Sequence, residues 1–313
     1  MPYPRIDRLG LVPRLIVNAD DFGLTSGVNR AIIELHQAGV LTSTTLMANA
    51  AASDESIELA LANPTLGVGC HIVLVDGTPV LSPRQDVPNL ANPVTGEFRS
   101  SLAEFLGWRY LKKNSPFQLS AAVEIEAEAS AQIRLLQSRG LHLTHVDTHK
   151  HTHMFPAVLR PVLRAARACG ITRIRNPFDS AWSRRTAASV PWLRRAQVAA
   201  LSRLEAHTLG IIADHGFTTT DGTISVTITG SLNTESLCRT LACMPEGTWE
   251  LVTHPGYHDA DLDAVPTRLK ASREIERQAL TAIKGFPAIE LTNFTGLDST
   301  VLESHGTGAA VGS

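Results

Sequence analysis

The chain has 313 residues, of which 43% are hydrophobic and 19% charged, and its formal net charge is -2 at pH 7. This length suits one barrel-sized domain, and so small a net charge gives no reason to expect a nucleic-acid partner. No run of eighteen apolar residues occurs, and the amino-terminal residues contain no apolar signal core. We therefore expect a globular, cytoplasmic protein.

Short β-like runs alternate with helical patterns along the chain, which is typical of parallel βα units. In the first helical pattern Val28, Ile32 and Leu35 form one apolar stripe that can face a sheet. The sequence predicts an α/β fold, a (β/α) barrel that is complete or nearly so, with its chemistry at the carboxyl ends of the strands. The predicted strands cover residues 14–18, 43–48, 67–73, 143–147, 171–175, 250–253 and 288–291, and the predicted helices cover residues 25–37, 53–62, 119–138, 156–168, 234–242 and 267–283.

Two adjacent carboxylates, Asp20 and Asp21, end the first predicted strand and place negative charge where a buried run meets a loop. Neighbouring side chains on a strand point to opposite faces, so the pair can share one site only if the backbone turns between them. Gly23 favours such a turn. The alternative is that one of the two aspartates caps the helix that follows.

Histidines lie within or just after three later strands. His71 interrupts the apolar run 67–73, where a lone histidine is more often a hydrogen-bonded core residue. His254 follows the strand 250–253 and precedes a Pro-Gly turn, so it is either a turn residue or part of the same site. Four histidines and an aspartate fall within residues 145–153, a density that packing explains poorly.

The geometry of that histidine cluster depends on the local backbone. On an extended strand His149, His151 and His153 would share one face, whereas on a helix only His149 and His153 would be neighbours. Imidazole and carboxylate ligands together suit Zn²⁺ and related transition ions. A solvated histidine-rich loop is the alternative.

Two stretches, near 75–100 and 180–230, interrupt the alternation of predicted strands and helices. We treat both as insertions in one domain, 1–298, which is followed by a mobile tail, 299–313. The loop 75–100 contains four prolines and is long enough to border a cleft. Residues around Asp221 and Gly222 predict a hairpin.

Segment 180–209 carries five arginines and one glutamate. A basic amphipathic helix in this segment can lie on an anionic membrane surface, which would make the protein peripheral to the inner membrane. More often it packs against the barrel or another subunit and leaves one face solvated. Its apolar stripe at helical spacing consists of Leu193, Ala196, Ala200, Leu201 and Leu204.

Four segments, at 18–23 (NADDFG), 69–71 (GCH), 147–153 (DTHKHTH) and 253–257 (THPGY), resemble in order and context the motifs of the YdjC-like carbohydrate deacetylases. The resemblance covers about residues 14 to 293. It implies a distorted (β/α) barrel akin to that of polysaccharide deacetylases, and removal of acetyl groups from N-acetylated amino sugars with a divalent metal. Within the family the chain looks most like the deacetylases of hopanoid biosynthesis, which act on a lipid-borne acetylglucosamine.

The resemblance also implies roles for individual residues. Asp21, His71 and His149 would be the metal ligands, which leaves coordination positions open for water and substrate. Asp20 would be the general base, and His254 would be the general acid that protonates the leaving amine. The roles of Asp20 and Asp21 could be exchanged without altering the pattern.

Three further residues have less defined expected roles. His151 and His153 would line the sugar site or orient a ligand imidazole. Arg175, at the end of its predicted strand, would pair with Asp20, bind substrate hydroxyls or simply lie on the surface.

The cofactor is expected to be one divalent ion. Ligand softness favours Zn²⁺, and the resemblance points equally to Mg²⁺. The expected partner is an N-acetylated amino sugar, which includes the sugar of a glycosylated hopanoid lipid. The sequence leaves open transient contact with a membrane and assembly into a homo-oligomer. Two other readings are a metal-dependent phosphoesterase, which usually has more carboxylates, and a non-catalytic carbohydrate- or lipid-binding barrel.

Overall fold

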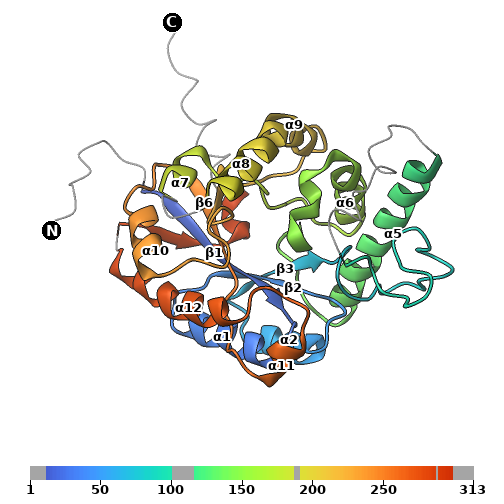
Figure 1. The fold of residues 1–313 in the computed structure, drawn as a ribbon, viewed down its shortest axis with the longest axis horizontal. Coiled ribbons are helices and arrows are strands. Elements are labelled where there is room, and N and C mark those ends of the chain that lie inside the picture. Colours follow the sequence, from blue (N-terminus) through green and yellow to red (C-terminus); the bar gives the residue numbers. More distant parts are fainter. Residues whose placement is uncertain (1–11, 101–115, 187–190, 287, 299–313) are drawn as a thin grey trace, which may run out of the picture.

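A curled parallel β-sheet with helices around it forms the core of the protein (Figure 1). The structure is a computed structural model that describes residues 12–100, 116–186, 191–286 and 288–298. Its strands are β1 (Arg14–Phe22), β2 (Ser43–Leu46), β3 (Gly67–Ile72), β4 (Val146–Thr148), β5 (Gly222–Ile224), β6 (Thr248–Thr253) and β7 (Glu290–Thr292). They pair in the order β4-β3-β2-β1-β6-β5, β7 also pairs with β1, and these pairings are all parallel.

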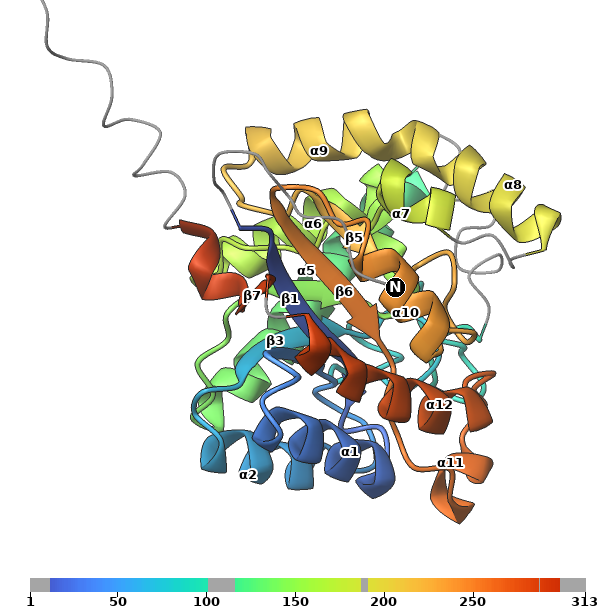
Figure 2. The same ribbon diagram turned by 90° about the vertical axis from the view of Figure 1, so that its left-hand side faces the viewer.

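The helices surround this sheet, as the view in Figure 2 also shows. The α-helices are α1 (Ser26–Gln37), α2 (Ser53–Ala62), α5 (Pro116–Ser138), α6 (Pro156–Ala168), α7 (Ala181–Thr186), α8 (Trp192–Leu201), α9 (Glu205–Asp214), α10 (Thr234–Leu241), α11 (Ala260–Ala264) and α12 (Ala271–Leu280). The 3₁₀-helices are η1 (His149–Met154), η2 (Ser202–Leu204), η3 (Thr281–Gly285) and η4 (Phe294–Asp298).

β1 lies at the centre of the sheet and has partners along both edges. Residues 14–19 pair with β6, whereas on the other edge residues 14–16 pair with β7 and residues from Asn18 to Phe22 pair with β2. From Leu15 onward the strand is buried. Enclosure on both faces explains why this strand is a continuous apolar run that ends in polar residues.

Single-residue bridges complete the ring between β4 and β5. The segment predicted as a strand at 171–175 forms only isolated pairs, because it changes partner within a few residues and no ladder can continue. That prediction is therefore wrong in detail, but the predicted distorted (β/α) barrel is confirmed. The parallel bridges that close the ring are Val146 with Ile174, Arg173 with Thr218, and Asp179 with Thr223.

The predicted hairpin around Asp221 and Gly222 is wrong. Gly222 starts β5, which runs parallel to β6. Asp221 Oδ2 accepts a hydrogen bond of 2.7 Å from the backbone N of Thr248 at the start of β6. A Cβ on Gly222 would lie 3.0 Å from the Trp249 ring. The Asp-Gly pair therefore begins a barrel strand, and the glycine permits its close approach to β6.

The basic segment 180–209 folds into α7, α8, η2 and the first part of α9. The hydroxyl of Thr208 on α9 donates a 3.2 Å hydrogen bond to Met154 O, so α9 packs on the barrel. In α8, however, Val198 is the buried residue, and Leu193 of the predicted stripe is 56% exposed. Val198 is thus the one buried side chain of α8, and Arg194 adds a 3.0 Å hydrogen bond from its Nη2 to Val226 O. No described helix is both long and apolar enough to span a membrane.

The proline-rich loop 75–100 is irregular, as predicted, and is held against α5. Glu128 accepts hydrogen bonds of 2.8 and 3.0 Å from the backbone N atoms of Val80 and Leu81. Asp76 at the start of this loop forms an ion pair with Lys150 of η1. The loop therefore begins beside the carboxyl ends of the strands. The predicted tail 299–313 lies outside the described residues.

Candidate active site

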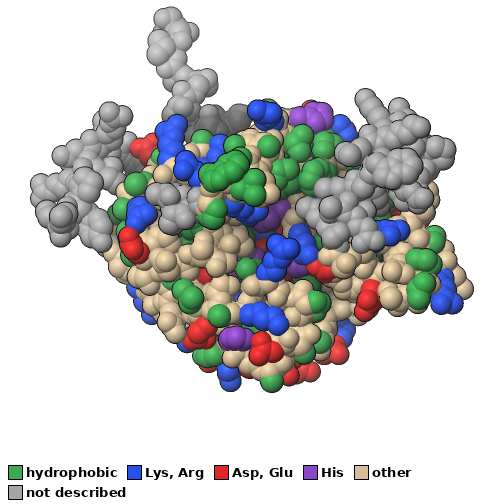
Figure 3. Space-filling model, in the orientation of Figure 1, with side chains coloured by type: hydrophobic (Ala, Val, Ile, Leu, Met, Phe, Trp, Pro, Cys, Tyr) green, Lys and Arg blue, Asp and Glu red, His purple; other side chains and the backbone are tan. Residues whose placement is uncertain are grey.

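The five residues expected to form the site all lie at the carboxyl end of the barrel. Asp20 and Asp21 are at the end of β1, His71 is near the end of β3, and His149 directly follows β4. His254 directly follows β6. Because the strands are parallel, their carboxyl ends meet at one end of the sheet. Histidine side chains are visible at the centre of the face shown in Figure 3, close to basic side chains.

The backbone turns between the two aspartates, as a shared site requires. Asp21 has a φ of 66°, and the register between β1 and β2 shifts between Ala19 and Phe22. Such a bulge brings a neighbouring side chain to the same side of a strand. Thr25 is the residue that caps α1, through a 3.3 Å hydrogen bond from Val28 N. The alternative in which an aspartate caps this helix is therefore wrong.

Three ligand atoms converge on one point. Asp21 Oδ1 lies 3.5 Å from His71 Nε2 and 3.4 Å from His149 Nδ1, and the two histidine nitrogens are 3.2 Å apart. Tetrahedral bonds of about 2.1 Å would separate their ligand atoms by about 3.4 Å, whereas octahedral bonds of the same length would separate neighbours by about 3.0 Å. Asp21 Oδ1 is buried and has no hydrogen-bond partner among the described residues. The three residues therefore fit a divalent ion, with spacing closest to tetrahedral.

A second carboxylate orients His71. Its Nδ1 donates a 2.8 Å hydrogen bond to Asp147 Oδ1, which leaves Nε2 facing Asp21 and His149. Burial lowers the pKa of His71, but the charge of Asp147 outweighs this effect and raises the pKa to about 10. A divalent ion would have to displace the proton on Nε2.

Asp20 is held by a fully buried guanidinium. Arg175 donates to both of its carboxylate oxygens, at 2.6 and 2.8 Å. Asn18 and Thr45 donate to Oδ1 at 2.9 and 3.1 Å. Burial alone would raise the pKa of Asp20, but Arg175 outweighs it and holds the pKa well below the usual range. Asp20 is therefore an ionised carboxylate, and Oδ2 carries fewer hydrogen bonds than Oδ1.

Arg175 also binds two other carboxylates. It forms an ion pair with Asp147, and its Nε donates a 2.7 Å hydrogen bond to Glu250 Oε1. Both of these acids are fully buried. One guanidinium thus pairs with three carboxylates, including that of Asp20. Burial raises the pKa of Glu250 to about 7. Of the three roles expected for Arg175, pairing with Asp20 is the one that the structure shows.

Glu250 is expected to make stability fall as the pH rises. Its folded-state pKa lies above its ordinary value, so its contribution is present below about pH 4.5 and is lost as the pH rises through about 7. Glu250→Gln should remove this dependence, on the order of 3 kcal/mol between those limits. Urea unfolding from pH 4.5 to 7.5 measures it, with exposed Glu58→Gln as the control. Parallel pH curves for wild type and Glu250→Gln would contradict the prediction.

His254 lies beside Asp20 and is positioned from α12. Its Nε2 is 3.8 Å from Asp20 Oδ2, and its backbone N donates a 2.7 Å hydrogen bond to Glu276 Oε2. The same Glu276 oxygen lies 4.0 Å from His254 Nδ1. The His254 side chain is 12% exposed. It can therefore reach a substrate while Glu276 fixes the backbone that carries it.

Sequence reasoning missed two residues of α12, Arg273 and Glu276. Arg273 is 1% exposed, and its Nη2 donates a 2.5 Å hydrogen bond to Asp21 Oδ2. Arg273 thus occupies one oxygen of Asp21 and leaves the other directed at the two histidines. The spacing of three places both α12 residues on one helical face, but on sequence they look like ordinary surface charges. Glu250 was detectable, because it interrupts an apolar strand as His71 does.

Comparison with known proteins agrees with this geometry. A family model described as YdjC-like protein matches residues 14–284. The chain belongs to the YdjC-like family. A carbohydrate deacetylase of Thermoanaerobacter pseudethanolicus is 30% identical to this YdjC-like protein over 269 residues, 85% of this chain and 90% of that one. A carbohydrate deacetylase of Brevibacillus brevis is 43% identical over 153 residues, 49% of this chain, and that match spans only 55% of the relative.

A solved structure shares the fold of this YdjC-like protein. It is a crystal structure from Enterococcus faecalis V583 of a protein provisionally described as acting in cellobiose-phosphate cleavage. It superposes with a TM-score of 0.69 at 26% identity and covers 91% of this chain and 98% of the other. The distorted barrel is thus the architecture of a solved relative.

The other histidines of this YdjC-like protein differ from His149 in their surroundings. Lys150 and His151 both have left-handed backbone conformations, so η1 is neither extended nor regularly helical. His153 is buried between Thr148 Oγ1, at 2.7 Å, and the backbone O of Arg175, at 3.2 Å. Burial lowers the pKa of His153 to about 4 and that of His151 to about 3. His149 alone among these three joins the group of ligand atoms found in the described residues.

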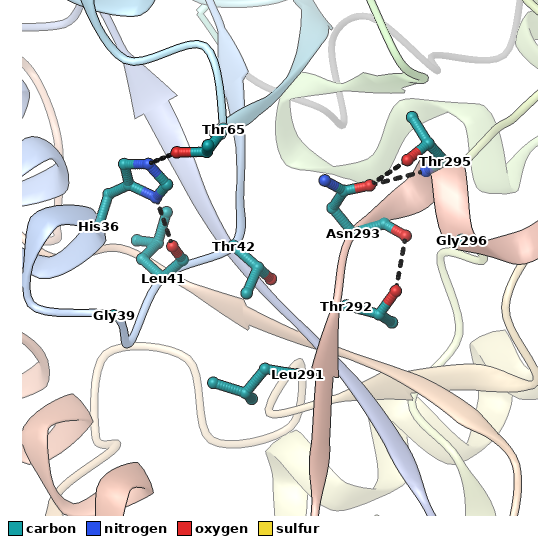
Figure 4. Close-up of a pocket in the computed structure, with 10 residues that line it drawn as sticks. All are labelled: His36, Gly39, Leu41, Thr42, Thr65, Leu291, Thr292, Asn293, Thr295 and Gly296. Atoms are coloured by element: carbon teal, nitrogen blue, oxygen red, sulfur yellow. Dashed lines mark hydrogen bonds between the residues drawn. The ribbon is translucent and has the colours of Figure 1, made fainter.

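A separate cavity of about 410 Å³ lies at the opposite end of the barrel (Figure 4). Thr42 on its wall directly precedes β2, and Thr65 lies in the turn before β3, so the cavity lies at the amino ends of the strands. Its histidine, His36, bonds Leu41 O at 2.8 Å and Thr65 Oγ1 at 2.9 Å. Both ring nitrogens of His36 are therefore hydrogen-bonded. The cavity lies at the end of the barrel that contributes to stability, away from the candidate active site.

Proposed function

We propose that this protein is a metal-dependent hydrolase that removes the N-acetyl group from an N-acetylated amino sugar. The observation that carries the proposal is the convergence of Asp21, His71 and His149 within 3.5 Å, flanked by Asp20 and His254. The carbohydrate deacetylases among its relatives support the same reaction. The spacing of the three ligands favours Zn²⁺ over Mg²⁺.

Each residue has a defined task in amide hydrolysis. A divalent ion held by Asp21, His71 and His149 would polarise the acetyl carbonyl and acidify a neighbouring water. Asp20 accepts the proton of that water as its oxygen bonds to the acetyl carbon, and Arg175 keeps Asp20 oriented and ionised. His254 donates a proton to the sugar nitrogen as the C–N bond breaks, which releases acetate and a free amine.

Two other activities fit these surroundings less well. A two-metal phosphoesterase would need a second ion, and the second cluster of possible ligands, Asp20, His71 and Asp147, is bridged by the Arg175 guanidinium. The basic residues near the site are also engaged, because Arg175 is fully buried and Lys150 pairs with Asp76. A binding barrel without turnover gives no account of His254, which Glu276 holds beside Asp20.

The substrate that we propose is lipid-borne, an acetylglucosaminyl hopanoid, reached from a membrane surface through segment 180–209. Acetate release should occur from this lipid and more slowly from soluble acetylated chitooligosaccharides. A chelator should abolish it, and Zn²⁺ should restore it better than Mg²⁺. Acetate release that survives complete metal removal would contradict the hydrolase mechanism, and equal rates on both substrates would contradict the lipid preference.

His254→Ala should discriminate between amide and ester substrates. An amide needs protonation of its leaving nitrogen, so we expect a loss of about 10²–10⁴-fold on the acetamide. A phenolic acetate ester has a leaving group that departs without that proton, and its hydrolysis should change less than about tenfold. Acetate release from both measures the difference, with exposed His258→Ala as the control. Equal losses on both substrates would exclude His254 as the general acid.

A further inference from the structure

A cavity of about 450 Å³ between α7 and α8 has a basic wall. Its polar lining comes from Arg184, Arg185, Arg195 and Thr227, and the rest is small or apolar. α7 begins just after Asp179, whose bridge to β5 closes the barrel. Thr227 lies three residues beyond Ile224, the carboxyl end of β5. The cavity therefore opens at the same end of the barrel as the candidate active site.

Of the three arginines that line this cavity, Arg184 has acidic neighbours in Asp179 and Glu205, whereas Arg185 and Arg195 form no ion pair within the described residues. Arg184 is fixed by a 2.6 Å hydrogen bond from its Nη1 to Asp179 O. Within the described parts of the chain, Arg185 and Arg195 have neither a hydrogen bond nor an ion pair from their side chains. Segment 180–209 has a charge of about +4 from five arginines and Glu205, although the chain as a whole carries -2. The rest of the protein is therefore clearly acidic, and the positive charge is concentrated here.

Large apolar side chains lie next to these arginines. Trp192 is 78% exposed and Leu193 is 56% exposed, both in the first turn of α8. Hydrophobic and basic side chains lie side by side around α8 on the face shown in Figure 3. An exposed tryptophan and leucine beside unpaired arginines are typical of a surface that contacts the headgroup region of a bilayer.

We propose that the α7–α8 face docks on a membrane of anionic phospholipids, with lipid phosphate groups held by Arg185 and Arg195. Guanidinium groups bind phosphate through two parallel hydrogen bonds, and Trp192 and Leu193 enter the interface beside them. A second copy of the chain is a poorer occupant, because a symmetric contact would bring two arginine clusters together. The inference rests on the proposed function in one respect, since docking at this end brings a lipid-borne sugar to the site.

The test is sedimentation of the full chain with phosphatidylcholine vesicles that contain or lack phosphatidylglycerol. We expect binding only to the anionic vesicles, and its loss near 1 M salt, where the screening length falls to about 3 Å. Arg185→Glu/Arg195→Glu should weaken binding at least about tenfold, because each arginine near an anionic surface contributes about 1 kcal/mol. Arg134→Glu/Arg160→Glu makes the same charge change on exposed positions of α5 and α6 and should bind like wild type.

Trp192→Ala/Leu193→Ala tests the apolar part of the surface, and we expect weaker binding with the salt dependence unchanged. Thermal unfolding of every variant establishes that it is folded. Absence of binding to anionic vesicles, or equal loss in the α5–α6 control variant, would overturn the proposal.

Other occupants give distinct results. Self-association without lipid that is lost in Trp192→Ala/Leu193→Ala would identify a second copy as the occupant and overturn docking. Calorimetric binding of inorganic phosphate without vesicle binding would identify a site for a soluble anion and also overturn it. Acetate release from soluble oligosaccharide by wild type is measured in parallel. Vesicle binding without acetate release from either the lipid or the soluble oligosaccharide would refute only the proposed function, and acetate release without vesicle binding would refute only the docking.

Discussion

Asp21→Asn is expected to lose the divalent ion, whereas Asp20→Asn should keep the ion and lose about 10²–10⁴-fold in turnover. Asp21 Oδ1 is the buried, unbonded oxygen that faces His71 and His149, and an amide is a much weaker ligand than a carboxylate. Asp20 is saturated by Arg175, Asn18 and Thr45 on one oxygen and faces His254 with the other. Replacement of Asp20 should therefore affect proton transfer more than ion binding.

Metal content after dialysis, together with acetate release, separates these two results. Exposed Asp214→Asn is the control and should match wild type in both measurements. Retention of the ion by both variants would contradict the assignment of Asp21 as a metal ligand. Loss of the ion from Asp20→Asn alone would show that Asp20 is the ligand and Asp21 the general base. Unfolding curves are needed as well, because Asp21→Asn also weakens the partner of the buried Arg273.

Arg175→Met should destabilise the fold by about 3–5 kcal/mol at pH 7, the range found when one partner of a buried ion pair is removed. The substitution keeps most of the side-chain volume but leaves Asp20, Asp147 and Glu250 without their shared cation. The loss should shrink as the pH falls, because these carboxylates can then be protonated and need no counter-charge.

Urea unfolding measures this loss, and Arg139→Met provides a matched control. Arg139 also pairs with a carboxylate, Asp54, at 2.6 Å, but its side chain is 42% exposed and that of Asp54 is 82% exposed. An exposed pair contributes less than about 1 kcal/mol. Equal destabilisation by the two substitutions would contradict a central role for Arg175, as would a loss that does not depend on pH.

Local features of the chain predicted a large part of the barrel and its site. Apolar runs and helical periodicity located most strands and helices, and polar residues at the ends of the apolar runs marked the site. The barrel places Asp20, Asp21, His71, His149 and His254 together because parallel strands share one carboxyl end. The errors arose where pairing is short, since the segment at 171–175 forms only single bridges.

The sequence by itself determined which residues stand at the strand ends, because that depends on periodicity and on the parallel order of βα units. Only the tertiary structure decided which partners these residues have. Arg273 and Glu276 reach Asp21 and His254 from α12, more than 250 residues along the chain from Asp21 in the case of Arg273. Packing likewise made Arg175 a buried cation and left α8 exposed, because burial depends on contacts between distant segments that no local pattern encodes.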